Sequence, residues 1–114
     1  MAHKAIYALM VAGLATSGNA NAFSGNDLIK WLPEYEQGTS LNSGMYLGYV
    51  SGVADIGNNI LFCAKSTVTR GQLAAIVGKY LRNNPESWQE EASTLVTAAL
   101  EKAFPCPEAP AKNK

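Results

Sequence analysis

Histidine is almost absent from this 114-residue chain, whose one histidine is His3 near the N-terminus. Ser-His-Asp and Cys-His catalysis both require a base that titrates near neutral pH, and histidine-based zinc sites require imidazole ligands. A pair of carboxylates could still support hydrolysis, but the acidic residues stand where surface charges are expected and form no evident pair. These residues are Asp55, Glu34, Glu36, Glu90 and Glu91. The sequence therefore predicts a protein that is not an enzyme and needs no metal or other cofactor.

Long apolar runs are also missing. The apolar run at residues 5–16 is shorter than the ~20 residues that a membrane-spanning helix requires. It follows a basic start and precedes Ala20-Asn21-Ala22, the small-x-small pattern that signal peptidase cuts. No lipobox cysteine follows. We predict a cleaved signal peptide over residues 1–22 and a periplasmic protein, mature from Phe23, that is not held in the membrane. The alternative is a buried N-terminal helix.

The chain has no excess of charge of either sign, because nine Lys and Arg balance nine Asp and Glu. A nucleic-acid-binding protein of this size would carry a basic excess, so no nucleic-acid partner is expected. The length of residues 23–107 suits one domain, small enough that a covalent cross-link would help to stabilise it. The Pro-, Ala- and Lys-rich tail, residues 108–114, is expected to be disordered.

Cysteine is scarce as well, since Cys63 and Cys106 are the whole content and form no CxxC pair. This spacing is not that of a metal or redox motif. In an oxidising compartment two such cysteines usually pair. Closing the loop between them would restrict the unfolded chain by about 4 kcal/mol. We expect a structural disulfide, and the alternative is a reactive thiol.

The stretch Leu41–Phe62 contains no proline and is expected to form a central helix, with apolar residues at helical spacing. Two adjacent apolar stripes run along it: Met45, Tyr49, Val53, Ile56 and Ile60 form the first, and Leu47, Val50, Ala54 and Leu61 the second. A helix that is apolar over more than half its circumference must contact at least two partners.

Three glycines of this helix, Gly44, Gly48 and Gly52, are spaced by four residues and lie along one side. Each costs roughly 1 kcal/mol relative to alanine in a helix interior, so the run needs a compensating reason. Without side chains they leave a groove that a second backbone can approach. Either another helix of the same chain packs there, or the groove is a docking notch for another molecule.

The segment before the central helix predicts a short first helix. Asn26 or Ser24 can cap it, and Pro33 is expected to end or kink it. Residues 34–40 then read as a loop. Trp31 is expected to close one end of the core.

Two further helices follow. Thr69 and Gln72 form a capping box, and this helix is expected to run to about Asn83. The last helix is expected to start at residues 84–86, Asn-Pro-Glu, and to stop at Pro105. No strand pattern is found. The prediction is an all-α, small four-helix bundle with a short first helix, cross-linked by one disulfide.

Several short motifs stand in a fixed order along these helices. They are the run at 49–55 (YVSGVAD), Phe62-Cys63, the run at 68–73 (VTRGQL), Lys79-Tyr80-Leu81 with Asn84-Pro85-Glu86, and the run at 103–106 (AFPC). As a set they resemble the Rap/Tai family of immunity proteins. Many relatives carry a second cysteine pair, in the first helix and just before the central motif, where this chain has Trp31 and Tyr46. The first helix is therefore expected to be held by packing alone.

The resemblance implies a function that composition does not. Proteins of this family lie in the periplasm and neutralise type VI secretion amidases. These toxins are papain-like cysteine peptidases that cut the stem peptides of peptidoglycan. The immunity protein, typically a helical homodimer, blocks the active-site groove of the toxin. The implied partner is therefore a peptidoglycan amidase effector.

Inhibition of this kind requires an exposed element that enters a cleft. The candidates are the connection after the central helix, with Lys65, Ser66, Thr67 and Arg70, and the polar arc of that helix, with Ser51, Asp55, Asn58 and Asn59. The connection is expected to be pre-organised, because the disulfide and the capping box hold its two ends. It could equally be an ordinary solvated turn. Asp55 could instead be a partly buried carboxylate paired with Arg70 or Lys79.

A periplasmic acid-stress chaperone is the alternative from another class. Such a protein would lose its native dimer at about pH 2 to 3 and suppress the aggregation of a client, which an immunity protein has no reason to do. An accessory subunit of the cell envelope is a third, weaker reading.

Overall fold

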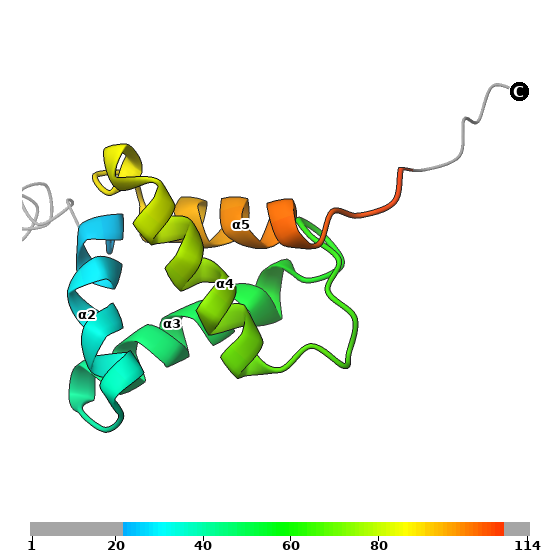
Figure 1. Cartoon of the computed structure of the whole chain (residues 1–114). Helices are drawn as coiled ribbons and strands as arrows, with labels where there is room; N and C mark the ends of the chain where they lie inside the picture. Colours follow the sequence, from blue (N-terminus) through cyan, green and yellow to red (C-terminus); the bar gives the residue numbers. More distant parts are fainter. Residues whose placement is uncertain (1–21, 109–114) are drawn as a thin grey trace, which may run out of the picture.

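The computed structural model describes residues 22–108, so nearly all of the predicted signal peptide and of the predicted tail lies outside the described residues. The elements are α2 (Gly25–Gln37), α3 (Leu41–Gly57), α4 (Arg70–Asn83), the short 3-10 helix η1 (Pro85–Ser87) and α5 (Ala92–Ala103) (Figure 1). Between residues 22 and 108 there is no strand, only two isolated bridges. The prediction of an all-α, four-helix bundle is confirmed. No helix in the described part of the chain is long and apolar enough to cross a membrane.

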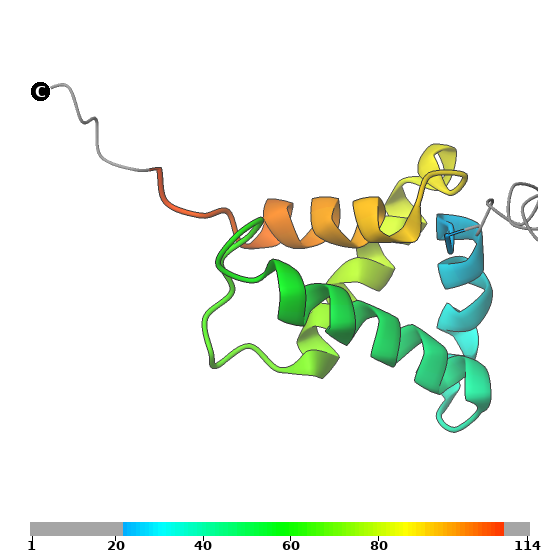
Figure 2. The ribbon, with the colours of Figure 1, turned by 180° about the vertical axis from the view of Figure 1, so that it is seen from behind.

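The core lies between the inner face of α3 and the other helices, and the view from behind shows α3 crossing in front of α4 (Figure 2). Its largest fully buried side chains are Tyr46, Phe62, Leu28, Leu32, Leu81, Leu95, Leu100, Val50, Val77 and Val96. The one polar group among them has a partner, because the Tyr46 hydroxyl donates to the carbonyl of Ala74 at 2.7 Å. Burial raises the pKa of the Tyr46 phenol.

The helix α2 is longer than predicted. It begins after Ser24, which forms a capping box with Asp27, and it passes through Pro33 to end at Gln37. Pro33 was expected to end or kink the helix, and an end there was wrong. The loop expected at residues 34–40 is confined to residues 38–40. Packing on both sides of the proline accounts for this. Trp31 is buried before it, and the Tyr35 ring lies 5.0 Å from that of Tyr46 after it.

The helix α3 is shorter than predicted, because it ends at Gly57 rather than at Phe62. Asn58 has extended backbone angles and Asn59 has a φ of 67°, so the chain reverses there. The reversal returns Phe62 to the core, where it is fully buried and its ring would lie 2.9 Å from a Cβ at residue 57.

The predicted stripes of α3 are only partly right. The core face consists of Tyr46, Val50, Ala54 and Gly57. Most of the first predicted stripe is half-buried, and its last two residues, Ile56 and Ile60, are exposed. The helix therefore has more apolar surface than the rest of the chain covers.

The helix α4 is as predicted, with the Thr69–Gln72 capping box and an end at Asn83. The start of the last helix was predicted wrongly, because α5 begins at Ala92 and residues 84–91 form η1 and the turns that follow it. These turns bind the start of α2. Gly25 N–H donates to the carbonyl of Glu90 at 2.9 Å, and Asn26 N–H donates to that of Trp88 at 2.8 Å.

Those hydrogen bonds explain why α5 starts later than predicted and how the start of α2 is held. The first N–H groups of a helix lack partners within it, and here the turns before α5 supply them. In turn, Ala92 N–H donates to the carbonyl of Phe23 at 2.7 Å, so backbone groups around the start of α5 bond to the segment at the start of α2 instead of extending α5. The expectation that packing alone holds the first helix was therefore wrong, because backbone hydrogen bonds also hold it.

Candidate partner-binding site

Seven of the eight candidate residues line one groove. It lies between the end of α3, the connection at residues 58–69 and the start of α4, and its volume is about 770 Å³. The candidates that line it are Asp55, Asn58, Asn59, Lys65, Ser66, Thr67 and Arg70. The two candidate elements, the loop and the polar arc of the helix, thus line the same groove.

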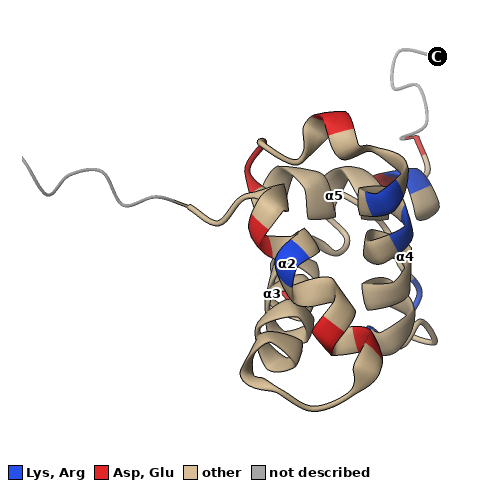
Figure 3. Ribbon diagram, turned by 60° about the vertical axis from the view of Figure 1, so that its left-hand side comes forward, with Lys and Arg blue, Asp and Glu red and all other residues tan. Residues whose placement is uncertain are grey.

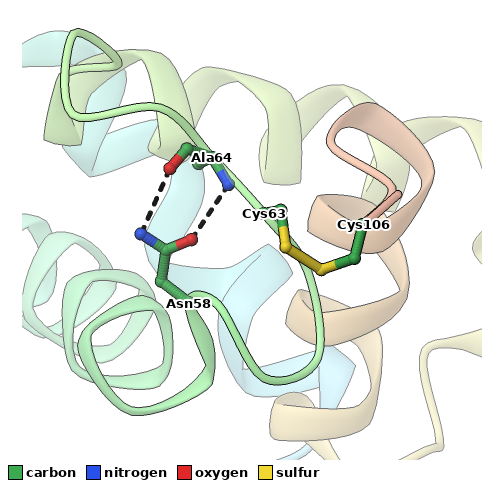
Figure 4. Close-up of a disulfide and its surroundings, with 4 residues drawn as sticks. All are labelled: Asn58, Cys63, Ala64 and Cys106. Carbon is green, nitrogen blue, oxygen red and sulfur yellow. Dashed lines mark hydrogen bonds between the residues drawn. A yellow bond between two sulfur atoms is a disulfide. The ribbon is translucent and has the colours of Figure 1, made fainter. Parts of the chain in front are cut away.

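Asn58 holds the near end of the connection. Its side-chain amide donates to the carbonyl of Ala64 at 3.2 Å, and Ala64 N–H donates to the Asn58 Oδ1 at 2.9 Å (Figure 4). The amide of Asn58 thus pairs with the backbone of Ala64 as a neighbouring strand would. Asn58 serves first as a structural brace for the loop.

The residue next to Ala64 is tied to a different helix. Cys63 forms the predicted disulfide with Cys106, with an S–S distance of 2.01 Å, and its N–H donates to the carbonyl of Phe104 at 2.8 Å. Figure 4 shows the two attachments side by side, Ala64 toward the end of α3 and Cys63 toward the end of α5. Two successive residues are therefore fixed to two elements, which leaves the root of the loop little freedom.

The far end of the connection is fixed by the cap of α4. Thr69 Oγ1 accepts from Gln72 N–H at 3.1 Å, and Gln72 Oε1 accepts from Thr69 N–H at 2.7 Å. Val68 N–H donates to the carbonyl of Lys65 at 3.0 Å, which closes a turn. Residues 65–67 are exposed between these anchors. This arrangement fits the expectation of a loop held at both ends.

Two opposite charges stand at the edge of the groove. Arg70 and Asp55 approach to 3.9 Å, and their side chains are 68% and 69% exposed. The expected partner of Asp55 is therefore present, but the expectation that this carboxylate is partly buried was wrong. An exposed pair at this distance contributes little to stability, so both charges are free to engage another molecule.

A model of the Rap1a immunity proteins matches residues 24–106 of this chain. The chain belongs to the Rap1a immunity protein family. The match runs from the cap of α2 to the second cysteine of the disulfide and so includes all four helices. A search of curated proteins gave no match.

Ser51 is the candidate that lies apart from the groove of this Rap1a-family protein. Its hydroxyl is buried and has no hydrogen-bond partner among the described residues. The groove thus gains nothing from Ser51, although the side chain stands on the same helix as Asp55.

Sequence reasoning missed the apolar floor of the groove, which consists of Ala54, Phe62 and Leu73. The available signal was the apolar Phe62 directly before Cys63. The sequence did not show that the Phe62 side chain points into the core, because the helix was predicted to continue through this residue.

Within residues 22–108, no three His, Cys, Asp or Glu residues lie together so as to hold a metal ion. The site therefore offers a rigid polar rim over an apolar floor, which suits binding.

Proposed function

We propose that this Rap1a-family protein is a periplasmic immunity protein that binds a type VI secretion peptidoglycan amidase and blocks its active-site groove. The amidase is a papain-like cysteine peptidase, as in the wider Rap/Tai relationship that the motifs suggest. The signal peptide over residues 1–22 and a homodimeric state are parts of the same proposal. The observation that carries it is the convergence of the candidate loop and helix arc on one groove, in a chain of the immunity family.

The exposed turn at residues 65–67 is the element that enters the toxin. It is polar and held at both ends, by Asn58 and the disulfide on one side and by the cap of α4 on the other. A loop that is already ordered loses little entropy on binding, so more of the contact energy remains as affinity. Lys65 lies in the turn and Arg70 follows it at the start of α4, and both are exposed.

Inhibition by this route needs no chemistry in the immunity protein. The loop has only to occupy the cleft that holds the catalytic cysteine and histidine of the toxin, so that the stem peptide cannot enter. The described part of the chain is suited to this, because its candidate residues are binding groups on a fixed scaffold.

The test is calorimetric titration of the oxidised protein into the peptidoglycan amidase encoded beside it, with amidase activity followed in parallel. We expect stoichiometric binding and loss of activity. Lys65→Glu should weaken binding at least tenfold, because it reverses a charge within the inserted turn. Lys102→Glu is the matched control, since it reverses an exposed lysine on α5 that does not line this groove and should leave binding unchanged.

If the titration releases or absorbs no heat and the amidase is not inhibited, this amidase is not the partner. Equal weakening by the two lysine variants would instead place the contact outside the groove. The acid-stress chaperone is then tested by measuring client aggregation at about pH 2 to 3.

A further inference from the structure

The helices α4 and α5 enclose a second groove, which the proposed function does not use. Its volume is about 360 Å³, and residues of the second half of α4 and the last turns of α5 line it. Pockets for small ligands typically have volumes of roughly 300–1,000 Å³. The groove shares no lining residue with the candidate partner-binding site. It is therefore a second place where this protein can hold another molecule.

The floor of the groove is apolar. Ala99 of α5 is buried there, and Ala103, one turn later, is exposed. On α4, Ile76 and Tyr80 are also one turn apart, line the same groove and are half-buried. Because the two residues from α5 are alanines, the space between the helices is not filled by side chains of the chain itself. An aliphatic side chain of another molecule can be buried in that space.

Both charged residues that line the groove are cations, Lys79 of α4 and Lys102 of α5. They are exposed, and neither forms an ion pair within residues 22–108. Arg82, three residues after Lys79, differs because it bonds to Glu36 of α2 and does not line the groove. Figure 3 shows blue positions gathered on α4 and at the end of α5. No carboxylate of the groove offsets the two ammonium groups, so it favours an anion.

Asn84 adds a hydrogen-bond acceptor to the groove. This residue is half-buried, and its side-chain Nδ2 donates to the carbonyl of Tyr80 at 2.8 Å. A carbonyl can only accept, so the amide nitrogen of Asn84 faces it and the Oδ1 atom is the other end of the side chain. That oxygen accepts no hydrogen bond from residues 22–108. It can therefore accept one from an N–H group of a ligand.

We propose that the groove between α4 and α5 binds a short acidic peptide. Two carboxylates of the peptide face Lys79 and Lys102, an aliphatic side chain lies on the apolar floor, and a main-chain N–H donates to Asn84. A phosphate ion would satisfy the two lysines, but it has neither an apolar part nor an amide N–H. A fatty acid also lacks the amide. The inference goes beyond the proposed function and does not depend on toxin inhibition.

The exposure of the two lysines sets the expected strength. Exposed ion pairs contribute little each, because water solvates and salt screens both charges. We therefore expect a Kd on the order of 100 μM. Affinity should fall severalfold between about 20 mM and about 500 mM salt, since the Debye length shortens over this range.

Nuclear magnetic resonance of the isotope-labelled, oxidised protein tests the site directly. The probe is acetyl-Glu-Leu-Glu-amide, which should shift the amide signals of Lys79, Asn84, Ala99 and Lys102 in a saturable way. The control peptide, acetyl-Gln-Leu-Gln-amide, has the same shape without the charges and should bind at least tenfold more weakly. Equal binding of the two peptides would overturn the proposal. So would the absence of saturable shifts at on the order of 10 mM peptide, or shifts caused by inorganic phosphate but not by the peptide.

Exposed positions allow variants that keep the fold. Lys79→Gln and Lys102→Gln should each weaken peptide binding at least about threefold, because each removes one charge contact. Ala103→Leu keeps both charges and fills the groove, and it should weaken binding by at least as much. Lys30→Gln is the matched control, because it is an exposed lysine on α2 that does not line the groove, and it should change nothing. Binding that survives Ala103→Leu, or that responds equally to all three lysine variants, would overturn the proposal.

This proposal and the proposed function fail separately. Lys102 does not line the candidate partner-binding site, so Lys102→Glu should abolish peptide binding and leave the amidase titration unchanged. A protein that binds the peptide but does not inhibit the amidase loses the immunity function and keeps this site. A protein that inhibits the amidase but binds no peptide loses only this site.

Discussion

The two ends of the bundle are held together by different means. At the α2 end, the start of α2 binds the turns before α5 through backbone hydrogen bonds, and Tyr46 fills the core beside it. At the loop end, the connection at residues 58–69 and the end of α5 are joined by the disulfide and by the Asn58 brace. Both ends use hydrogen bonds and buried apolar side chains, but only the loop end adds a covalent cross-link.

The amount of core available at each end explains the difference. The α2 end has several large side chains to bury, whereas residues 65–67 at the loop end are polar and exposed. A loop that buries little cannot recover its conformational entropy through packing, so covalent and hydrogen-bonded anchors take that role. The end that carries the candidate groove is therefore held in place while its surface stays exposed. Five changes test this contrast, from the largest expected effect to the smallest.

Removal of the central aromatic should have the largest effect. Tyr46→Ala should lower the free energy of unfolding by about 3–5 kcal/mol, because it leaves a cavity among α2, α3 and α4. Tyr46→Phe is the matched control and should cost only about 1 kcal/mol, from the lost hydrogen bond to Ala74. Urea unfolding followed by circular dichroism measures both. Equal losses would show that the hydroxyl, and not the ring, stabilises this end.

Removal of the disulfide should come next. The Cys63→Ser, Cys106→Ser double variant should lose about 2–4 kcal/mol, because the cross-link spans 43 residues and restricts the unfolded chain. Hydrogen exchange should speed up most at residues 63–69 and much less in α2. Loss of protection in α2 first would contradict the division between the two ends.

Close packing at the α2 end can be tested at one glycine. A Cβ at Gly25 would lie 2.4 Å from Leu95 Cδ1 and 2.8 Å from the carbonyl oxygen of Trp88. Gly25→Ala should therefore cost about 1–3 kcal/mol. Gly44→Ala meets open space and should instead stabilise the helix by about 0.5–1 kcal/mol. Thermal unfolding should give opposite shifts for the two variants, and shifts of the same sign would refute the packing argument.

The Asn58 brace should have a smaller effect on stability than on the loop. Asn58→Ala should cost about 1–2 kcal/mol, because two partly buried hydrogen bonds to Ala64 are lost. Asn83→Ala, an exposed asparagine on α4, is the control and should be nearly neutral. Amide exchange at Ala64 reports the loosened loop. Unchanged exchange there would mean that the disulfide alone holds it.

The smallest effect is expected at an exposed ion pair of the α2 end. The hydrogen bond from Arg82 to Glu36 holds the pKa of the Glu36 carboxyl below its ordinary value. Its contribution is therefore present above about pH 4.5 and is lost as the pH falls through the folded-state pKa. Glu36→Gln should remove at most about 0.5 kcal/mol at neutral pH, since exposed pairs are screened by solvent. Stability measured from pH 3 to pH 7, roughly across this titration range, should then vary less in the variant than in the wild type.

The sequence alone determined the class of fold, the disulfide and the cap of α4. Helical spacing, a Thr–Gln capping box and two cysteines in an otherwise cysteine-free chain are local or compositional signals, and each predicts one outcome. Most of the candidate groove could be predicted too, because its loop and helix arc are neighbours along the chain.

Only the tertiary structure decided the ends of the helices and the directions of their faces. Pro33 lies within α2 because core packing continues past it, and α3 stops at Gly57 because the chain must turn to bury Phe62. The last helix starts late because backbone groups around its start bond to the segment at the start of α2. Each of these outcomes depends on atoms distant in sequence or on a reversal of the chain, and for that reason no local pattern could have predicted them.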